Sequence, residues 1–363
     1  MNGHYNIVEF LLKNSNLNID TNAKDNAGST GFSLACQGGH LNIVKALGKI
    51  SIALGINLNV KVDRNQTPFI LACKRGHYDV ANILMKNSVS SNIDLNAKDN
   101  GGHTAFHLAC NSGHFEVANM FIENSVTLSI DLNSKDNAGQ TAFQLACRRG
   151  FGSNVVKMFM KNSAMLSNYL NTKENKGQTA LHWACAWGDS YVAKKFIEFM
   201  IIDINKKDDA GQTAFHLACR YGHFNVAKIF MENSAALRIE LNTKDNEGQT
   251  PLYLACRAQS VGHVNVVKMF MDNSATLGID LNIKDNAGQT PLHLACRWGY
   301  IKIVKVFMEN SATSSTDFNT KDNAGRTAFQ LALNSDQKFS RNCVRIMRKN
   351  ADTLKIDLET DSY

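Results

Sequence analysis

The residue types best suited to chemistry in this 363-residue chain are nine cysteines and eleven histidines. Thiolates and imidazoles bind zinc when several converge at short spacings, and pairs of thiols can form disulfides. Eight of the cysteines, however, recur at nearly constant intervals: Cys36, Cys73, Cys110, Cys147, Cys185, Cys219, Cys256 and Cys296. Such recurrence indicates one structural position repeated along the chain, and no Cys and His spacing within an interval matches a zinc site.

The in-register cysteines are predicted to be small, buried core residues with unpaired, reduced thiols. In a stack of helical units, equivalent residues lie about 8–10 Å apart, whereas the Cα atoms of a disulfide are rarely more than about 7 Å apart. Cys343 is the one cysteine outside the pattern. A series of unpaired cysteines is typical of a reducing compartment. We therefore predict an intracellular protein of the cytoplasm, with the nucleus as an alternative location.

Most histidines also recur in register. One repeated position holds His107, His182, His216 and His293, and another holds His4, His40, His77, His114, His223 and His263, so only His103 lies outside both series. Carboxylates such as Asp285 and Asp322 repeat in the same way, which marks them as turn residues rather than acid–base pairs. The sequence contains no Gly-rich phosphate loop, Ser-His-Asp set or kinase motif. We therefore predict no catalytic residue, metal site, cofactor or small-molecule substrate, and no enzyme.

These positions belong to a unit that begins at a threonine. The threonine recurs at Thr30, Thr67, Thr104, Thr141, Thr179, Thr213, Thr250, Thr290 and Thr327, with spacings of 37, 37, 37, 38, 34, 37, 40 and 37 residues. A fixed period in this range is the signature of a solenoid. Threonine suits a helix N-cap, and the only three prolines, Pro68, Pro251 and Pro291, directly follow it, at the first helical position.

The rest of the unit predicts two helices and a finger. A short apolar helix, such as residues 214–221, ends at a glycine suited to a left-handed cap. A second amphipathic helix follows, such as residues 265–271, and then a polar finger, such as residues 280–289, with an Asp-Asn-x-Gly turn. Where that glycine is replaced, the substitute is Asn65, a residue that tolerates positive φ.

The unit resembles the ankyrin repeat, a turn and two helices with a T-P-L-H-x-A core. The best matches are Thr290-Pro291-Leu292-His293-Leu294-Ala295 and Thr250-Pro251-Leu252-Tyr253-Leu254-Ala255. The resemblance covers essentially the whole chain, as about nine full repeats and an N-terminal half-repeat. It implies an all-α solenoid of stacked helix–turn–helix units with β-hairpin-like fingers, and a surface that binds other proteins.

Three departures from the usual 33-residue period are expected to be local. Most copies carry about four more residues after an Asn-Ser pair, such as residues 275–279, and we expect this extra turn to lengthen the second helix. The copy at Thr250 has three further residues around Gln259-Ser260-Val261, and the copy at Thr141 has one near Phe151-Gly152. We expect both as bulges between the helices.

The repeat pattern predicts three parts. Residues 1–29 are predicted to be a truncated half-repeat without its first helix. We therefore expect Ile7, Val8, Leu11 and Leu12 to be incompletely buried. Residues 30–326 read as eight tandem repeats. Residues 327–363 read as a C-terminal capping repeat, because basic residues such as Arg341 and Arg345 crowd it and a solenoid needs a polar end.

The repeats differ most at the two residues after the cysteine. We interpret the basic and aromatic members of this series as the partner-binding site, because Arg, Trp and Tyr dominate binding hot spots. These candidates are Lys74, Arg75, Arg148, Arg149, Trp187, Arg220, Tyr221, Arg257, Arg297 and Trp298. By resemblance to ankyrin repeats, they line the concave groove. The competing interpretation is structural, because cations at a helix C-terminus also favour the helix dipole.

The charge balance favours a protein partner over nucleic acid. The net charge is +7, from 39 basic and 32 acidic residues, which is modest for this length. An extended acidic segment with apolar residues would complement the basic and aromatic positions. No apolar run of 18 residues occurs, so no membrane span is predicted.

The leading hypothesis is a non-enzymatic scaffold or adaptor. The alternatives are a regulatory or anchoring ankyrin fragment of a larger protein, such as a kinase, a ubiquitin-ligase adaptor or an ion channel, and an effector secreted by an unconventional route. The resemblance also implies one candidate partner, an asparaginyl hydroxylase acting on finger asparagines such as Asn96, Asn133 and Asn282.

Overall fold

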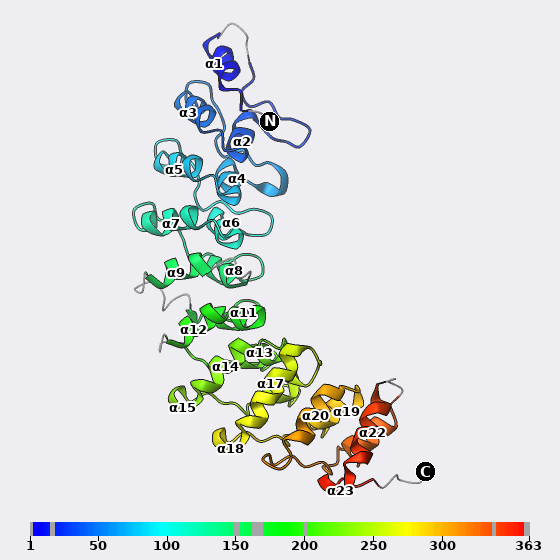
Figure 1. Ribbon diagram of the computed structural model, residues 1–363. Coiled ribbons are helices and arrows are strands. Elements are labelled where there is room, and N and C mark those ends of the chain that lie inside the picture. The colour runs from blue at the N-terminus through cyan, green and yellow to red at the C-terminus, as the bar shows by residue number, and fades with distance from the viewer. Residues whose placement is uncertain are drawn as a thin grey trace. The chain divides into compact units, whose positions relative to one another are not determined.

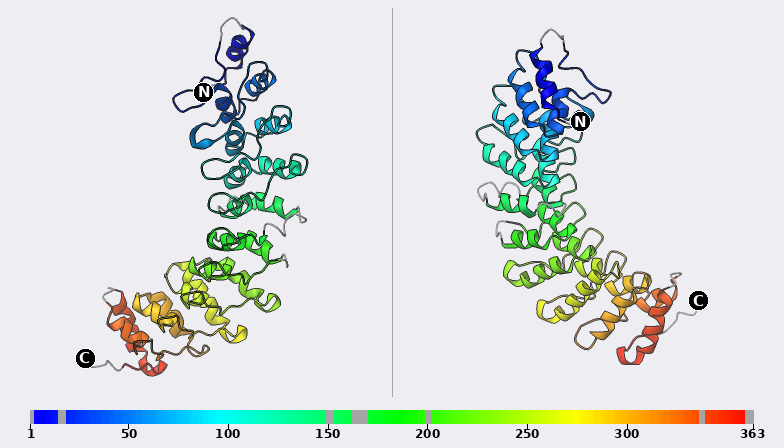
Figure 2. Two further views of the ribbon diagram at one scale, coloured as in Figure 1. Left: turned by 180° about the vertical axis from the view of Figure 1, so that it is seen from behind. Right: turned by 45° about the horizontal axis from the view of Figure 1, so that its top comes forward.

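The structure is a computed structural model that describes residues 3–14, 19–148, 153–161, 170–198, 202–335 and 339–358. The chain divides into two compact units, Met1–Asn175 and Lys176–Tyr363. In each unit, pairs of short antiparallel helices repeat, and each helix packs against its counterpart in the next pair. Figures 1 and 2 show the two resulting layers in the first unit, with α2, α4, α6 and α8 in one and α3, α5, α7 and α9 in the other.

Each pair consists of a first and a second helix. In unit 1 the first helices are α2 (Gly31–Gln37), α4 (Pro68–Arg75), α6 (Ala105–Ser112) and α8 (Ala142–Arg148). The second helices of unit 1 are α1 (Tyr5–Lys13), α3 (Leu41–Lys49), α5 (Tyr78–Lys86), α7 (Phe115–Asn124) and α9 (Ser153–Lys161), and a 3₁₀ turn, η2, spans Asp63–Asn65.

In unit 2 the first helices are α11 (Ala180–Trp187), α13 (Ala214–Arg220), α16 (Pro251–Ala255), α19 (Pro291–Arg297) and α21 (Ala328–Leu333). The second helices are α12 (Ser190–Glu198), α14 (Phe224–Glu232), α17 (Val261–Asp272), α20 (Ile301–Glu309) and α22 (Ser340–Lys349). Three one-turn helices follow second helices: α15 (Ser234–Leu237), α18 (Ser274–Leu277) and α23 (Ala351–Leu354).

The predicted threonine caps start the first helices. At α13, the Thr213 hydroxyl accepts the His216 backbone N–H, and the Thr213 N–H donates to the His216 ring Nδ1 at 3.1 Å. This reciprocal capping box satisfies two donors that a helix start leaves unpaired. Pro68, Pro251 and Pro291 stand at the first turn of their helices. The capping prediction is therefore confirmed.

The core of each unit lies between its two layers of helices. Phe106 of α6 meets Phe121 of α7 with ring centroids 5.3 Å apart, and Phe215 of α13 meets Phe230 of α14 at 5.4 Å. These four rings are almost completely buried. Full burial of such a side chain contributes about 1.5–3 kcal/mol, so repeated phenylalanines provide much of the stability of each stack.

The extra four residues per repeat do not lengthen the second helix, so that prediction was wrong. At α14, the Asn233 side-chain amide donates to the Ile229 carbonyl at 2.8 Å, and the Ser234 hydroxyl donates to the Met231 carbonyl at 2.8 Å. These side chains satisfy carbonyls at the helix end and so stop the helix. The extra residues then form the separate turn α15, which ends at Arg238 with φ 52°.

The fingers connect successive repeats through tight turns. In one, the Asp245 N–H donates to the Gln249 carbonyl at 2.9 Å, while the Asp245 carboxylate accepts the Glu247 and Gln249 N–H groups. Gly248 has φ 78°, and a Cβ there would lie 2.8 Å from the backbone nitrogen of Asn286 in the next finger. Only glycine fits that approach. The aspartates are turn residues, as predicted.

Two details of the fingers also match or refine the predictions. Asn65, which replaces the finger glycine, has φ 63°, as expected. The described fingers approach a β-hairpin only at two isolated bridges, Lys135 with Thr141 and Lys321 with Thr327.

The three-residue insertion in the Thr250 copy is shared between a connection and a helix. Helix α16 ends at Ala255, residues 256–260 are non-helical, and Val261 already belongs to α17, which Ser260 caps. The expected bulge is therefore present, but α17 is also longer at its start. The insertion expected near Phe151-Gly152 lies outside the described residues.

The two ends of the repeat array differ. Helix α1 has no buried residue, and Ile7 and Phe10 are 58% and 63% exposed, so the expected lack of cover is confirmed. Helix α22 buries Cys343, Val344 and Met347 on one face. Its outer face carries exposed arginines, and the Arg348 guanidinium lies 5.8 Å from the Phe329 ring centroid.

Candidate protein-binding surface

The candidate residues lie at or just beyond the ends of first helices. In unit 2 they form a series that we call the helix-one row: Trp187, Arg220, Tyr221, Arg257, Arg297 and Trp298. In unit 1, Lys74 and Arg75 end α4. Arg148 ends α8, but its side chain, like the whole of Arg149, lies outside the described residues. Unit 2 therefore presents the better defined part of the predicted site.

Histidines of the following repeat hold the backbone of these positions. His263 Nε2 donates to the Arg220 carbonyl at 2.9 Å, and His223 Nε2 donates to the Ala186 carbonyl at 3.0 Å. In unit 1 the equivalent bond joins His114 to the Lys74 carbonyl at 3.1 Å. Each ring thus fixes the end of a first helix, from which the row side chains project. The predicted structural role is confirmed for His77, His114, His223 and His263, whereas the buried Nε2 of His40 has no hydrogen-bond partner among the described residues.

The aromatic members of the row face solvent. Trp187, Tyr221 and Trp298 are 54%, 52% and 45% exposed, which is unusual for such large apolar side chains. Packing within the protein therefore leaves about half of the surface of Trp187 and Tyr221 uncovered.

The arginines of the row differ in how they are held. The Arg220 guanidinium donates to the Gln212 side chain at 3.3 Å. Arg257 and Arg297 are exposed, and neither side chain has a hydrogen bond or ion pair within the part of the chain that the structure describes. The guanidinium groups of Arg257 and Arg297 are therefore available to an acidic ligand.

The buried histidines of the first helices are structural. His216 Nδ1 accepts from the Thr213 N–H, and Nε2 donates to the Gln249 carbonyl at 3.3 Å, so both ring nitrogens are used. Burial lowers the pKa of His216 to about 4, and burial also lowers the pKa of His107 and His293. At neutral pH these rings are uncharged and sealed between repeats, which leaves no proton-transfer role for them.

His103, the one histidine out of register, bridges two fingers. Its ring nitrogens lie 3.1 Å from Asp99 Oδ1 and 3.4 Å from Asp136 Oδ2 in the next repeat. The hydrogen bond to Asp136 raises the pKa of His103, aided by the negative charges of both carboxylates. Burial pushes the pKa of Asp136 upward, but the hydrogen bonds from His103 and from the Gln140 backbone, together with the nearby histidine charges, lower the pKa overall. The cluster links two repeats by hydrogen bonds and becomes an ion pair when His103 is protonated.

The in-register cysteines are buried, as predicted, and Cys343 is buried too. Burial raises the pKa of thiols along this series, and that of Cys343 to about 11. Because the thiolate is the reactive form, we expect a thiol reagent at neutral pH to modify few of the nine cysteines of the native protein within minutes. Intact-mass measurement checks this, with labelling in guanidinium as the control. Rapid native labelling of most cysteines would contradict it.

Among the described residues, no group of three or more His, Cys, Asp or Glu side chains is arranged to hold a metal ion. The same part of the chain contains no helix that is both long and apolar enough to cross a membrane.

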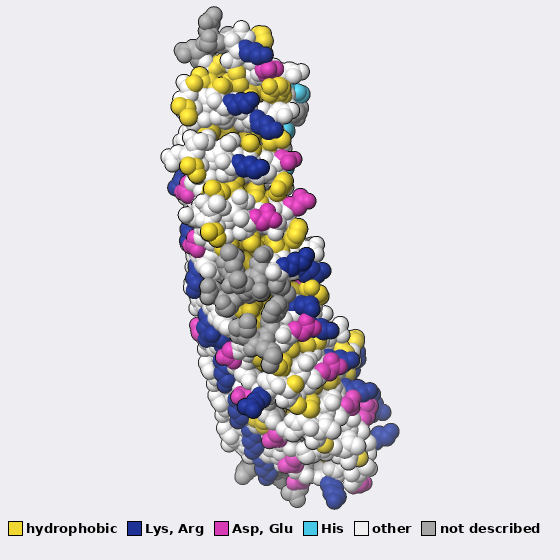
Figure 3. Space-filling model, turned by 90° about the vertical axis from the view of Figure 1, so that its left-hand side faces the viewer, with side chains coloured by type: hydrophobic (Ala, Val, Ile, Leu, Met, Phe, Trp, Pro, Cys, Tyr) yellow, Lys and Arg dark blue, Asp and Glu magenta, His cyan; other side chains and the backbone are white. Residues whose placement is uncertain are grey.

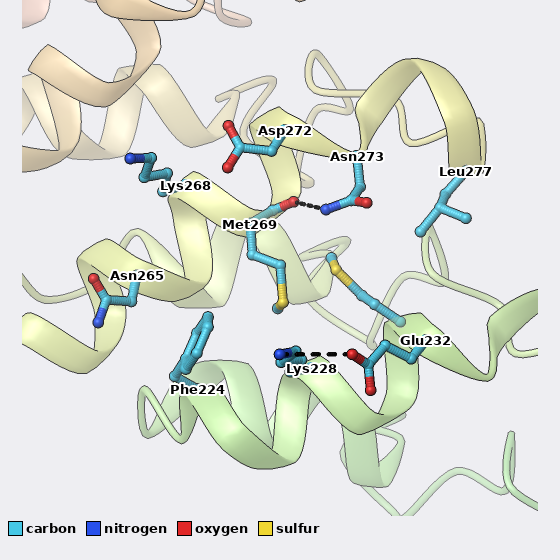
Figure 4. A pocket seen from close by; sticks show the side chains of 10 residues that line it. Phe224, Lys228, Glu232, Asn265, Lys268, Met269, Asp272, Asn273 and Leu277 are labelled. Carbon is cyan, nitrogen blue, oxygen red and sulfur yellow. Dashed lines mark hydrogen bonds and ion pairs between the residues drawn. The ribbon is translucent and has the colours of Figure 1, made fainter.

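The structure also shows grooves between second helices, which sequence reasoning did not single out. One, of about 630 Å³, lies between α14 and α17. Figure 4 shows its apolar residues, Phe224 and Met269, beside the Lys228–Glu232 ion pair of 3.7 Å. On α17, Lys268 and Asp272 occupy the positions equivalent to Lys228 and Glu232 in the preceding repeat. Comparing second-helix charges between repeats would have identified this surface.

Comparisons with known proteins agree with the helix-pair architecture. A family model described as Ankyrin repeats (3 copies) matches residues 1–99, 49–136, 124–208, 191–285 and 274–357. The crystal structure of the human ASB11 ankyrin repeat domain is similar, with a TM-score of 0.53 and 20% sequence identity, over 66% of this chain and 97% of that one. At this identity the likeness concerns the fold alone. A comparison with curated proteins finds no match.

Ankyrin repeats are in general modules that bind other proteins. The family matches span residues 1 to 357, and the described helices form the stacked pairs expected of an all-α solenoid. The chain belongs to the ankyrin-repeat family.

Proposed function

We propose that the protein is a non-enzymatic interaction scaffold that binds a partner protein through the helix-one row of unit 2. The observation that carries the proposal is the exposure of Trp187, Tyr221 and Trp298 at one repeated position. Such side chains provide most of the binding energy in protein interfaces. The core and finger positions, by contrast, are nearly the same in every repeat, as structural positions should be.

The chemistry of the row favours an extended partner segment with acidic and apolar residues. The Arg257 and Arg297 guanidinium groups can each pair with a carboxylate, and the indole rings offer apolar contact area. Lys74 and Arg75 extend the same chemistry to unit 1. The proposal places the scaffold in the cytoplasm, where a series of unpaired thiols stays reduced.

An asparaginyl hydroxylase is a further candidate partner, acting on finger asparagines such as Asn96, Asn133 and Asn282. The Asn282 amide donates to the Ser315 carbonyl at 2.7 Å and accepts the Asp317 N–H at 2.8 Å. The corresponding Asn96 bonds reach Ser129 and Asp131. Asn96 and Asn133 are exposed, so the two bonds restrain the Asn96 side chain without burying it.

The test begins with affinity capture of partners by the intact protein and mass spectrometry, followed by alanine variants of the six row residues. Truncating Trp298 or Arg220 should cost about 2 kcal/mol or more of binding free energy, which corresponds to roughly a 30-fold rise in Kd. Binding should also weaken as salt rises, because the arginine contacts are screened.

Arg341→Ala and Arg345→Ala on the outer face of α22 provide the matched control, since they remove exposed charge outside the row. These variants should bind the captured partner normally. Thermal melts should change little across the panel, because exposed substitutions affect stability weakly. If binding is unchanged in all row variants, or falls only where the melting temperature also falls, the row is structural.

A further inference from the structure

In unit 1, three apolar side chains are exposed at equivalent positions of successive repeats. Ile52, Val89 and Val126 each follow a serine just beyond the end of a second helix, at intervals of 37 residues, and they are 84%, 83% and 85% exposed. In unit 2 the same position holds Ala235, Ala275 and Ala312. Folding gains almost nothing from a β-branched side chain left in water. The sequence of unit 1 also has an alanine at this position in one repeat, Ala164, so the difference points to a surface property of the repeats that hold Ile52, Val89 and Val126.

A groove of about 530 Å³ lies beside Ile52, between α3 and α5. Val44, Ile83 and Leu84 contribute apolar surface to it, and Lys45 and Lys49 contribute the charged groups. Both lysines are exposed. The groove therefore combines apolar side chains with polar groups of Ser51, Asn87, Ser90 and Ser91, and its charged groups are basic.

The charge of this groove distinguishes it from its counterpart in unit 2. No Asp or Glu lines the α3–α5 groove, whereas Glu232 and Asp272 line the α14–α17 groove. The last residue of the second helix is Lys49 or Lys86 here, but Glu232, Asp272 or Glu309 in unit 2.

None of Lys45, Lys49 and Lys86 forms an ion pair with any residue that the structure describes. Figure 3 looks onto this side of the molecule and shows hydrophobic and basic side chains next to one another over α3 and α5. The basic part ends at α7, whose last turn carries Glu123.

We propose that this surface docks an acidic amphipathic helix of a partner protein. The surface, which we call the helix-two surface, comprises Lys45, Lys49, Ile52, Ile83, Lys86 and Val89. Its unpaired lysines call for carboxylates, and its exposed Ile52 and Val89 side chains call for an apolar anchor. It is built from second helices and belongs to unit 1, so it is separate from the helix-one row of unit 2.

The repeat spacing accounts for the choice of a helix. Packed helices of neighbouring repeats lie about 8–10 Å apart, so Ile52 and Val89 are separated by a similar distance along the stack. Seven residues of an α-helix advance about 10.5 Å. Apolar side chains seven residues apart on one ligand helix can therefore contact both positions, while acidic residues on either side of them face the lysines.

The probe is a fluorescent helical peptide of about 15 residues, with leucines seven residues apart and glutamates flanking them. A comparison peptide replaces every glutamate with lysine. Fluorescence anisotropy with the full chain should show the acidic peptide binding at least about tenfold tighter, a difference of about 1.4 kcal/mol, and weakening as salt rises.

Two double variants test the surface itself. Lys49→Glu with Lys86→Glu reverses two of its positive charges, and Ile52→Ser with Val89→Ser removes the exposed apolar groups. Each should weaken binding of the acidic peptide by about tenfold or more. All four side chains are exposed, so melting temperatures should stay close to the wild type. The matched control is Lys228→Glu with Lys268→Glu on the equivalent helices of unit 2, which should bind the peptide normally.

Several results would overturn the proposal. Equal binding of the acidic and basic peptides would exclude charge recognition, and unchanged binding in both unit 1 variants would exclude this surface. An equal loss in the unit 2 variant would show general electrostatic attraction. A basic surface with exposed apolar groups can also lie on an anionic membrane. Binding to phosphatidylserine vesicles that is lost in the unit 1 variants, without binding of the peptide, would assign the surface to lipid instead.

Discussion

Replacing His216 with glutamine is expected to make unit 2 markedly more resistant to acid. Burial lowers the pKa of His216 from 6.5 to about 4, so the ring is neutral in the folded protein. A lowered folded pKa contributes stability that is present above pH 6.5 and is lost as the pH falls toward 4. A shift of about 2.5 units corresponds to roughly 3 kcal/mol. Below about pH 5, therefore, protonation of the unfolded chain should destabilise the native repeats.

Glutamine is the appropriate substitution because the chain already uses it at this position. Gln144 accepts the Thr141 N–H at 2.9 Å and donates to the Thr172 carbonyl at 2.8 Å, and Gln330 accepts the Thr327 N–H at 2.8 Å. The bond from the threonine N–H matches that of His216, and the Gln144 amide adds an inter-repeat bond to a different finger carbonyl, without a titrating group. His216→Gln should therefore keep most of its stability at pH 7 and lose less on acidification.

The tryptophans make the measurement specific to unit 2. All three, Trp183, Trp187 and Trp298, lie in that unit. Urea unfolding, followed by tryptophan fluorescence at pH 7 and at about pH 4.5, gives the free energy of unfolding at each pH. The decrease between the two pH values should be smaller for His216→Gln than for the wild type, and smaller still when His293→Gln is added. Equal losses in all three proteins would show that these histidines do not control the acid response.

His103→Gln provides a control of opposite sign. Its bond to Asp136 raises the pKa of His103, so its stabilisation is fully present below pH 6.5 and is lost as the pH rises through the raised value. The effect should be at most about 1 kcal/mol, because the pair is partly exposed. Gln212 makes the equivalent inter-repeat bond to Asp245 at 2.9 Å. The variant should remove the extra low-pH protection of amides 98–104 from hydrogen exchange, without altering the tryptophan signal.

Phe270→Ala is expected to destabilise unit 2 by about 3–5 kcal/mol. Phe270 of α17 is completely buried and lies against Phe215 of α13, with ring centroids 5.8 Å apart. Phe215 in turn packs against Phe230 of α14 with nearly parallel rings. Removing one ring therefore leaves a cavity in a group of aromatic side chains contributed by three helices, where collapse is restricted.

Phe215→Leu is the matched control for this truncation. The equivalent first-helix position holds Leu252 in α16 and Leu292 in α19, so leucine is compatible with the same packing environment. Its cost should be below about 1.5 kcal/mol. Because each repeat contacts only its neighbours, hydrogen exchange in Phe270→Ala should accelerate first in α13, α14 and α17. Two results would contradict a local effect: hydrogen exchange that accelerates uniformly through unit 2, or equal decreases in the unfolding free energy of Phe270→Ala and Phe215→Leu.

Local chemistry in the sequence determined the repeating architecture. The threonine at each helix start, the prolines that follow it and the glycines at finger turns act through backbone geometry within a few residues, so their spacing predicts the helices and turns. The buried state of the cysteines followed for the same reason, since one position in a repeated unit has one environment. The cap at Thr213, the positive φ of Asn65 and the burial of Cys219 all agree with the prediction.

Features that depend on contacts between repeats were decided only by the tertiary structure. The extra residues after Asn233 and Ser234 do not extend α14, because those two side chains compete for the carbonyls that a longer helix would use. The 37-residue interval between Ile52 and Val89 could not show that both side chains are exposed, or that Lys49 lies beside a groove whose lining contains no carboxylate. Exposure, charge pairing and the protonation of His216 and His103 depend on which atoms of the next repeat surround each side chain, and that arrangement exists only in the folded stack.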